Sequence, residues 1–220
     1  VVIRNNYVEG YRGCHKTDQL GCTGDNGPGI VLHNYSQDIT IEGNVFYDNN
    51  LGIKIVDGKG PVDGVLIRNN VFYRNVSEGV AAYNTGRSIR VLNNTFVDNG
   101  IANLVLASGL VNAANKNNLF VGAGGANNDF GGDGNMRISD RSNAAFEDPD
   151  AKDFHLTAQS PAINKGVELT AVFKDMDGEI RPNDGAYDVG ADEYYGSTNV
   201  DPVDPPVGDG TEWYEVDGLV

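Results

Sequence analysis

The sequence lacks the features that define several large protein classes. Only 2 of its 220 residues are Cys, which excludes a small scaffold held together by many disulfides. No run approaches the roughly 18 consecutive apolar residues of a transmembrane helix, so we expect no membrane span. Lys and Arg number 16 against 31 Asp and Glu, and this shortage of basic residues argues against a nucleic-acid partner. The chain begins with neither an initiator Met nor a signal peptide, so we expect it to be a piece of a longer protein.

The few basic residues are unevenly distributed. Residues 1–146 contain 13 acidic and 12 basic residues, whereas residues 147–220 contain 18 acidic and only 4 basic ones. The chain therefore has a nearly neutral body and an acidic C-terminal third. The body does not repel an anionic ligand, but the C-terminal third would.

Two residue types are abundant instead: 26 Asn and 29 Gly. Five similar segments each carry an Asn at the same aligned position, namely Asn6, Asn44, Asn70, Asn94 and Asn118, with spacings of 38, 26, 24 and 24. A second apolar run recurs between them and begins with Gly29, Gly52 or Gly79. The runs read as short strands in which every second residue faces inward. Such strands in a repeat of about 24 residues predict a parallel β-solenoid.

Stacked coils would align equivalent side chains. The five Asn residues would form an amide ladder at one corner, as stacked Asn residues do in cross-β structures. Two residues after each of them comes an apolar residue that we expect to stack inside the coils: Val8, Phe46, Phe72, Phe96 and Phe120. Alternation predicts that Ile41, Ile67 and Val91 face inward and that Leu66 and Leu92 face outward. Both the ladder and the stack are interpreted as structural.

The repeated pattern of residues 67–72, Ile-Arg-Asn-Asn-Val-Phe, resembles the right-handed parallel β-helix superfamily that contains pectate lyases and related polysaccharide-active proteins. Matching coils cover residues 1–122, and the handedness is implied by the resemblance. Residues 175–182 and 188–194 resemble the closing segment of many secreted bacterial β-helix proteins. The resemblance implies an all-β fold, a right-handed parallel β-helix (solenoid) with an irregular C-terminal cap and extended tail, at a secreted or cell-surface location.

The chain is expected to have three parts. Residues 1–122 form coils that fit the repeat from the first residue, so further coils and an N-terminal cap are expected upstream. Residues 123–196 supply C-terminal coils and a capping segment. Residues 197–220 form an Asp/Pro-rich linker and the start of a possible next module. We therefore expect the partners of this chain to include other modules of the same parent chain.

One insertion interrupts the repeat, at residues 9–28. Such insertions emerge as loops on one side of a solenoid, often the binding side. Cys14 and Cys22 would stiffen this loop if they form a disulfide, although a metal pair or free thiols are alternatives. His15 alone is too little to complete a zinc set. Arg12, His15 and Lys16 are candidate substrate-binding residues.

The strand after this loop and the next two coils carry three candidate catalytic residues, His33, Lys54 and Tyr83, that could share one outer face. Elimination on a uronic acid needs a cation for the carboxylate, a base for the C5 proton and an acid for the leaving oxygen. These residue types suit those roles, and lyases of the resembling family use them, often with calcium. The alternative is that they are scattered surface residues.

A possible calcium site lies near the C-terminal end, at Asp175, Asp177 and Glu179. The Asp-x-Asp-Gly start suits a calcium loop, but the later ligands of an EF-hand are absent, so an acidic turn is the alternative.

The function that we predict is cleavage of an acidic polysaccharide by β-elimination. A lyase is favoured over a glycoside hydrolase because no pair of outward carboxylates can be picked out in the coils. The alternative is a non-catalytic carbohydrate-binding or adhesin module of a multidomain secreted enzyme.

Overall fold

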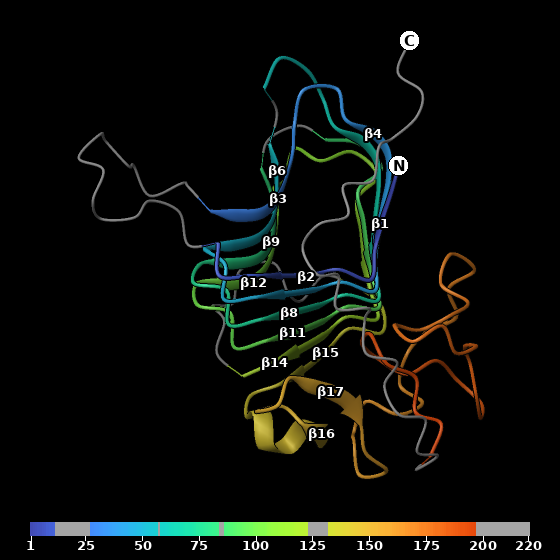
Figure 1. Ribbon diagram of the computed structural model, residues 1–220. Coiled ribbons are helices and arrows are strands. Elements are labelled where there is room, and N and C mark those ends of the chain that lie inside the picture. Colours follow the sequence, from blue (N-terminus) through green and yellow to red (C-terminus); the bar gives the residue numbers. More distant parts are fainter. Residues whose placement is uncertain (12–26, 57, 84–85, 123–131, 197–220) are drawn as a thin grey trace.

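Three parallel sheets form the body of the protein, and the chain winds from one sheet to the next (Figure 1). The computed structural model describes residues 1–11, 27–56, 58–83, 86–122 and 132–196. The first sheet contains β1 (Val2–Arg4), β4 (Gln37–Glu42), β7 (Asp63–Arg68), β10 (Arg90–Leu92) and β13 (Ala114–Lys116). The second contains β2 (Tyr7–Glu9), β5 (Val45–Tyr47), β8 (Val71–Tyr73), β11 (Thr95–Val97), β14 (Leu119–Val121) and β15 (Met136–Ile138). The third contains β3 (Pro28–Leu32), β6 (Leu51–Val56), β9 (Glu78–Tyr83) and β12 (Ala102–Leu106).

The predicted Asn ladder is present at the corner between the first two sheets. The amide Nδ2 of each Asn donates to Oδ1 of the next at 2.9 to 3.0 Å, from Asn6 through Asn44, Asn70 and Asn94 to Asn118. The backbone N–H of each also donates to the same oxygen. Neutral amides thereby satisfy the backbone of a buried corner, which would otherwise leave costly unpaired groups.

A second ladder, which we did not predict, lies at the corner after the second sheet. The amide of Asn49 donates to Oδ1 of Asn75 at 3.3 Å, and that of Asn75 donates to Oδ1 of Asn99 at 2.9 Å. All three side chains are buried. Two separate columns therefore account for much of the high Asn content.

The predicted aromatic stack fills the interior of the coils. Phe46 and Phe72 stack with ring centroids 4.9 Å apart, Phe72 and Phe96 at 4.8 Å, and Phe96 and Phe120 at 5.2 Å. Glycine is required beside this stack, because a Cβ at Gly52 would lie 2.3 Å from the carbonyl oxygen of Gly79 and 2.7 Å from the Phe72 ring. The Gly near the start of β3, β6 and β9 therefore makes room for an aromatic ring or its neighbours in the stack.

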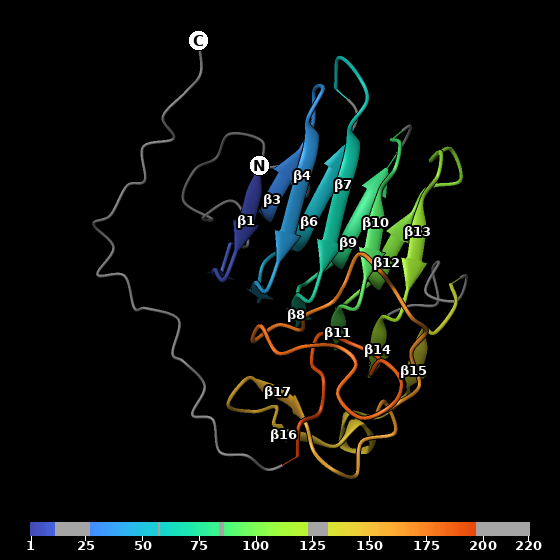
Figure 2. The same ribbon diagram turned by 90° about the vertical axis from the view of Figure 1, so that its right-hand side faces the viewer.

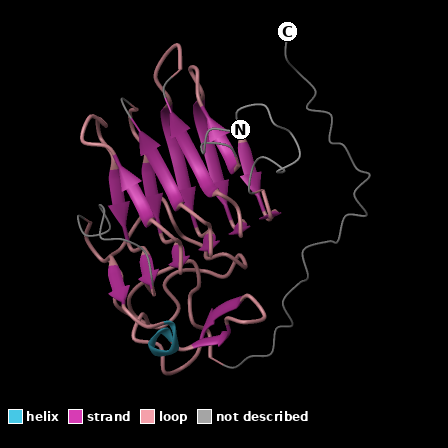
Figure 3. Ribbon diagram, turned by 90° about the vertical axis from the view of Figure 1, so that its left-hand side faces the viewer, coloured by secondary structure: helices cyan, strands magenta, loops and turns pink. Residues whose placement is uncertain are grey.

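Residues 132–162 close one end of the coils. Strand β15 continues the second sheet. It is followed by the 3₁₀ helix η1 (Arg141–Ala144) and an antiparallel pair, β16 (Phe146–Asp148) and β17 (Asp153–Leu156) (Figure 3). Within the described residues, no helix is long and apolar enough to cross a membrane.

Residues 163–195, the side-packed segment, run back along the coils as irregular chain (Figure 2). It contacts a column of Asn side chains whose backbone is left-handed, with φ of 48° to 54°. Asn69 donates to the carbonyl of Lys174 at 2.7 Å, Asn93 to that of Asp188 at 3.0 Å, and Asn117 to that of Val167 at 2.7 Å. Asn tolerates this backbone conformation better than most residues, so one column serves as both corner and docking surface.

This segment changes the environment of two residues on the first sheet. Leu66 and Leu92 point away from the coil interior, as predicted, but they are buried against Val172. Their apolar character thus has a cause, because the segment forms a second small core over this sheet.

Candidate functional site

The outer face of the third sheet aligns candidate residues from successive coils. Val31 pairs with Lys54, Lys54 pairs with Ala81, and Val56 pairs with Tyr83. Alternation places Ile53 and Ile55 inside the coil and leaves Lys54 and Tyr83 half-buried on the outer face.

Lys54 and Tyr83 line the same hollow on this face. Their outward positions in the repeat predicted a shared face but not a hollow. The volume of the hollow is about 270 Å³. This size lies just below the range for small-molecule sites, which starts near about 300 Å³. The complete lining consists of Pro28, Asn50, Leu51, Lys54, Ser77, Glu78, Tyr83 and Ile101.

A polar chain in this hollow is centred on Glu78. The Tyr83 hydroxyl donates to Oε1 of Glu78 at 3.3 Å, and the Ser77 hydroxyl donates to Oε2. Glu78 is only 8% exposed, so its carboxylate is held largely by protein groups. The hollow therefore combines an ammonium group, a carboxylate and a phenol that can donate a proton.

Glu78 was missed by sequence reasoning, although a signal was present. In the repeats of the third sheet the residue before the Gly is Pro28, Leu51 and Glu78 in turn. A charged residue at a position that is apolar in the other coils is a departure from the repeat, and departures of this kind mark candidate sites.

Of the other candidate residues of the predicted catalytic surface, His33 is the one that lies within the described residues, and it is not at the hollow. His33 follows β3, is exposed and does not belong to the lining. The loop residues Arg12, His15 and Lys16, together with Cys14 and Cys22, lie outside the described residues. Their predicted roles in substrate binding and in a disulfide stay predictions.

The residues of the predicted calcium site lie in the side-packed segment and not at the hollow. Oδ1 of Asp175 accepts hydrogen bonds from the backbone N–H of Asp177 at 3.0 Å and of Glu179 at 2.8 Å. Its other oxygen accepts from the backbone N–H of Glu193 at 3.2 Å. Asp175 thus orders a turn through both of its oxygens, while Asp177 faces His155.

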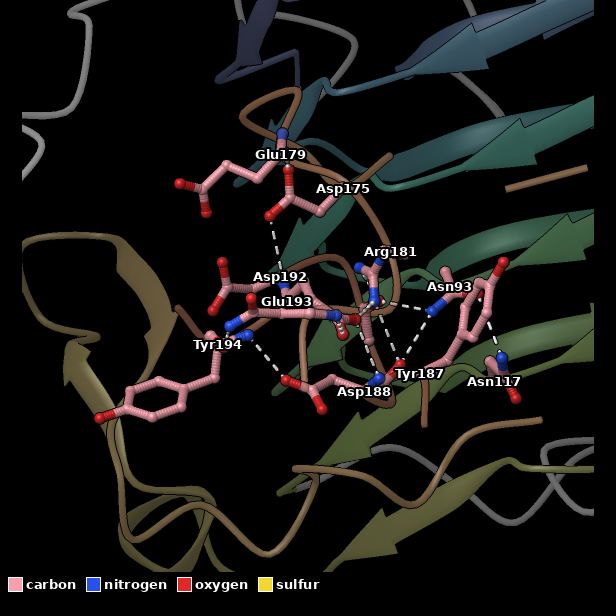
Figure 4. A network of polar contacts seen from close by, with 12 residues as sticks. Asn93, Asn117, Asp175, Glu179, Arg181, Tyr187, Asp188, Asp192, Glu193 and Tyr194 are labelled. Atoms are coloured by element: carbon pink, nitrogen blue, oxygen red, sulfur yellow. Dashed lines mark hydrogen bonds and ion pairs between the residues drawn. The ribbon is translucent and has the colours of Figure 1, made fainter. Parts of the chain in front are cut away.

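Residues 181–194 contain a buried ionic network (Figure 4). Arg181 and Glu193 form an ion pair at 2.8 Å whose side chains are both fully buried. The guanidinium also donates to the carbonyls of Asp188 and Gly190 at 3.2 and 2.9 Å. These contacts close the side-packed segment on itself, so the network is structural.

Asp188 belongs to the same network. Burial raises its pKa to about 6, even though its oxygens accept hydrogen bonds from the backbone N–H groups of Asn164 and Tyr194, both at 2.7 Å. The carboxyl group thus joins two stretches of the segment at an energetic cost of desolvation.

Comparison with known families agrees with the geometry of the coils. A family described as a right-handed beta-helix region matches residues 1–142, which is more than half of the chain. No curated protein matches the chain.

Proposed function

Because the chain belongs to the family of right-handed β-helix regions, we propose that it cleaves an acidic polysaccharide by β-elimination at the hollow of the third sheet. The fold itself fits a carbohydrate-related protein, since the side of a solenoid is a linear shelf that suits a linear polymer. The observation that supports cleavage is the convergence of Lys54, Glu78 and Tyr83 in one hollow on that side.

Each group has a role in the proposed reaction. A base removes the C5 proton of a uronate, the bond from C4 to the glycosidic oxygen breaks, and an acid protonates the leaving oxygen. Tyr83 is the proposed acid, and Glu78 orients its hydroxyl through their hydrogen bond. Lys54 is the proposed base, and a cation of the preceding loop such as Arg12 would neutralise the carboxylate as negative charge develops there. His33, the other residue predicted for these roles, does not line the hollow.

Three roles are extensions of this proposal. Arg12, His15 and Lys16 would bind carboxylates of the polymer. Calcium would bridge carboxylates of the substrate and the protein. A secreted location and attachment to other modules of a longer chain would give the protein access to a polymer outside the cell.

The test is an elimination assay with a panel of uronate-containing polysaccharides, with and without calcium, that follows the ultraviolet absorbance of the unsaturated product. We expect Tyr83→Phe and Lys54→Ala each to lower kcat by about 10²-fold or more, as loss of a general acid or a general base does. Glu78→Gln should lower kcat less and alter its pH profile, because Glu78 acts through Tyr83. Arg90→Ala, an exposed change on the first sheet, is the control. Cleavage that is unchanged in the Tyr83 and Lys54 variants would overturn the assignment.

A non-catalytic carbohydrate-binding role is the second candidate, and the apolar surface around the hollow favours it. Val31 is 43% exposed and Ile101 is 57% exposed on the face that carries Lys54. Such side chains can contact the apolar faces of sugar rings. This role predicts retention on an insoluble glycan without any product, and weaker retention for Ile101→Ser.

A further inference from the structure

Three side chains with metal-binding groups meet where residues 132–162, which close one end of the coils, contact the side-packed segment. His155 belongs to β17, Asp177 lies in the turn between Lys174 and Ile180, and Asp192 lies within residues 188–194. One nitrogen or oxygen of each lies within 4.8 Å of those of the other two. Three stretches that are distant in the sequence thus present their polar groups to one point.

The imidazole of His155 is oriented toward this point. Its Nδ1 lies 2.5 Å from Oδ1 of Asp153, and its Nε2 lies 2.9 Å from Oδ2 of Asp177. A histidine that binds a metal through one nitrogen usually donates its other N–H to a carboxylate, which fixes the tautomer and the ring orientation. Asp153 is placed to provide this support, and Nε2 is the nitrogen directed at the other two acids.

Asp192 is the independent observation that points to a ligand. The residue is only 4% exposed. Its Oδ2 accepts a hydrogen bond from the backbone N–H of Leu156 at 2.7 Å, whereas Oδ1 has no hydrogen-bond partner among the described residues. A carboxylate in a residue this deeply buried is costly unless positive charge compensates it, and Oδ1 is the oxygen that remains available to a cation.

We propose that His155 Nε2, Asp177 and Asp192 bind a divalent transition-metal ion such as Zn²⁺, with Asp153 as a positioning residue. One imidazole among the donors favours a transition metal over Ca²⁺ or Mg²⁺, which prefer oxygen ligands alone. Only Asp177 is shared with the calcium site that the sequence suggested.

The geometry requires a local adjustment of the side chains. Ligands bound about 2.1 Å from a tetrahedral Zn²⁺ lie about 3.4 Å apart, so a separation of up to 4.8 Å has to contract by up to about 1.4 Å and the 2.9 Å between Nε2 and Asp177 has to widen by about 0.5 Å. The side chain of Asp177 is 40% exposed and can rotate to supply that movement. The ion would replace a proton on Nε2 and would connect the β16–β17 pair to the side-packed segment.

The experiment is calorimetric titration of the full chain with zinc chloride after removal of metals with a chelator. The parent carries Cys14→Ser and Cys22→Ser, because those thiols could bind Zn²⁺ themselves. We expect saturation at one ion per chain and tighter binding as the pH rises, since a proton must leave Nε2. His155→Gln and Asp177→Asn should each weaken binding at least 10-fold, and Asp153→Asn about 10-fold. Glu168→Gln, an exposed acid in the same segment, should bind like the parent.

A second measurement, limited proteolysis, reports on the stability of the side-packed segment and not on the heat of binding. Zn²⁺ should slow proteolysis of the side-packed segment in the parent and not in Asp177→Asn, because an ion that binds only the folded form stabilises it. The absence of a saturable site, or equal binding by the parent, His155→Gln and Asp177→Asn, would overturn the proposal. So would Ca²⁺ binding that survives His155→Gln and is lost in Asp177→Asn, because that result describes a site made of carboxylates alone.

Discussion

The coil stack and the side-packed segment bury polar groups in opposite ways. In the stack, Asn44, Asn70 and Asn94 repeat one arrangement, in which a neutral amide bonds the next amide and the backbone around it. In the segment, Arg181 and Glu193 form a single ion pair that has no equivalent elsewhere in the described residues.

The two regions are therefore stabilised in different ways. A solenoid distributes its stability over similar contacts between neighbouring coils, so each amide column contributes at every level. The segment has no repeat and depends on a few buried charges, each of which is costly when its partner is lost. The two regions should therefore respond differently to the same kind of change.

The largest effect is expected from breaking the buried pair with Arg181→Met. This change leaves Glu193 charged, fully buried and without its cation, which costs about 3–5 kcal/mol of unfolding free energy. Denaturant unfolding should show the loss, and limited proteolysis should locate it in residues 163–195. Lys165→Met, an exposed cation of the same segment, is the control and should change the free energy of unfolding by less than about 0.5 kcal/mol.

A second variant sharpens the result. If the cost comes from an uncompensated charge, Arg181→Met combined with Glu193→Leu should recover part of the stability. A double variant that is less stable than Arg181→Met would show that the hydrogen bonds of Glu193, and not its charge, hold the segment.

A smaller effect is expected inside the Asn ladder. Asn70→Ala removes an amide that donates to the carbonyls of Ile41 and Arg68 at 2.9 and 2.8 Å and to Asn94 at 2.9 Å. Unsatisfied buried groups should cost about 2–3 kcal/mol. The same change at Asn6, which is exposed at the first level of the ladder, should cost under about 1 kcal/mol. Equal losses at both positions in denaturant unfolding would contradict a ladder whose contribution depends on burial.

Sequence reasoning predicted the coil stack well because repetition reveals it. The spacing of Asn6, Asn44, Asn70, Asn94 and Asn118 was enough to identify both the solenoid and its ladder. Even so, Asn49, Asn75 and Asn99 recur with the same spacing and were overlooked. Repetition also predicted that Lys54 and Tyr83 share a face, because the alternation along each strand and the register between coils determine the side on which each residue lies.

The side-packed segment was much less predictable. Its motifs identified a family-like ending, but nothing local in the sequence shows that Asn69, Asn93 and Asn117 bind it, or that Leu66 lies under Val172. The Asn contacts join positions that are 50 to 105 residues apart and follow no period. The meeting of His155 with Asp177 and Asp192 escaped prediction for the same reason, because three irregular stretches must fold before they are neighbours.

The smallest expected effect is a difference in pH response between the two regions. Burial raises the pKa of Asp188 from 3.8 to about 6, so between these values the folded segment binds more protons than the unfolded chain. By linkage, the contribution of Asp188 to the free energy of opening the segment should fall as the pH rises through this window. Asp192, whose pKa burial raises to about 7, and His155, whose pKa its hydrogen bond to Asp177 raises to about 10, should continue the fall at higher pH. The amides of the Asn ladder do not titrate, so the coils should show no matching change. Hydrogen exchange, corrected for intrinsic rates and measured with a chelator present, can resolve peptides from 163–195 and from the coils. Asp188→Asn should reduce the response of the segment below about pH 6 while lowering its overall protection. A parallel pH response in both regions would mean that the segment and the coils open as one unit.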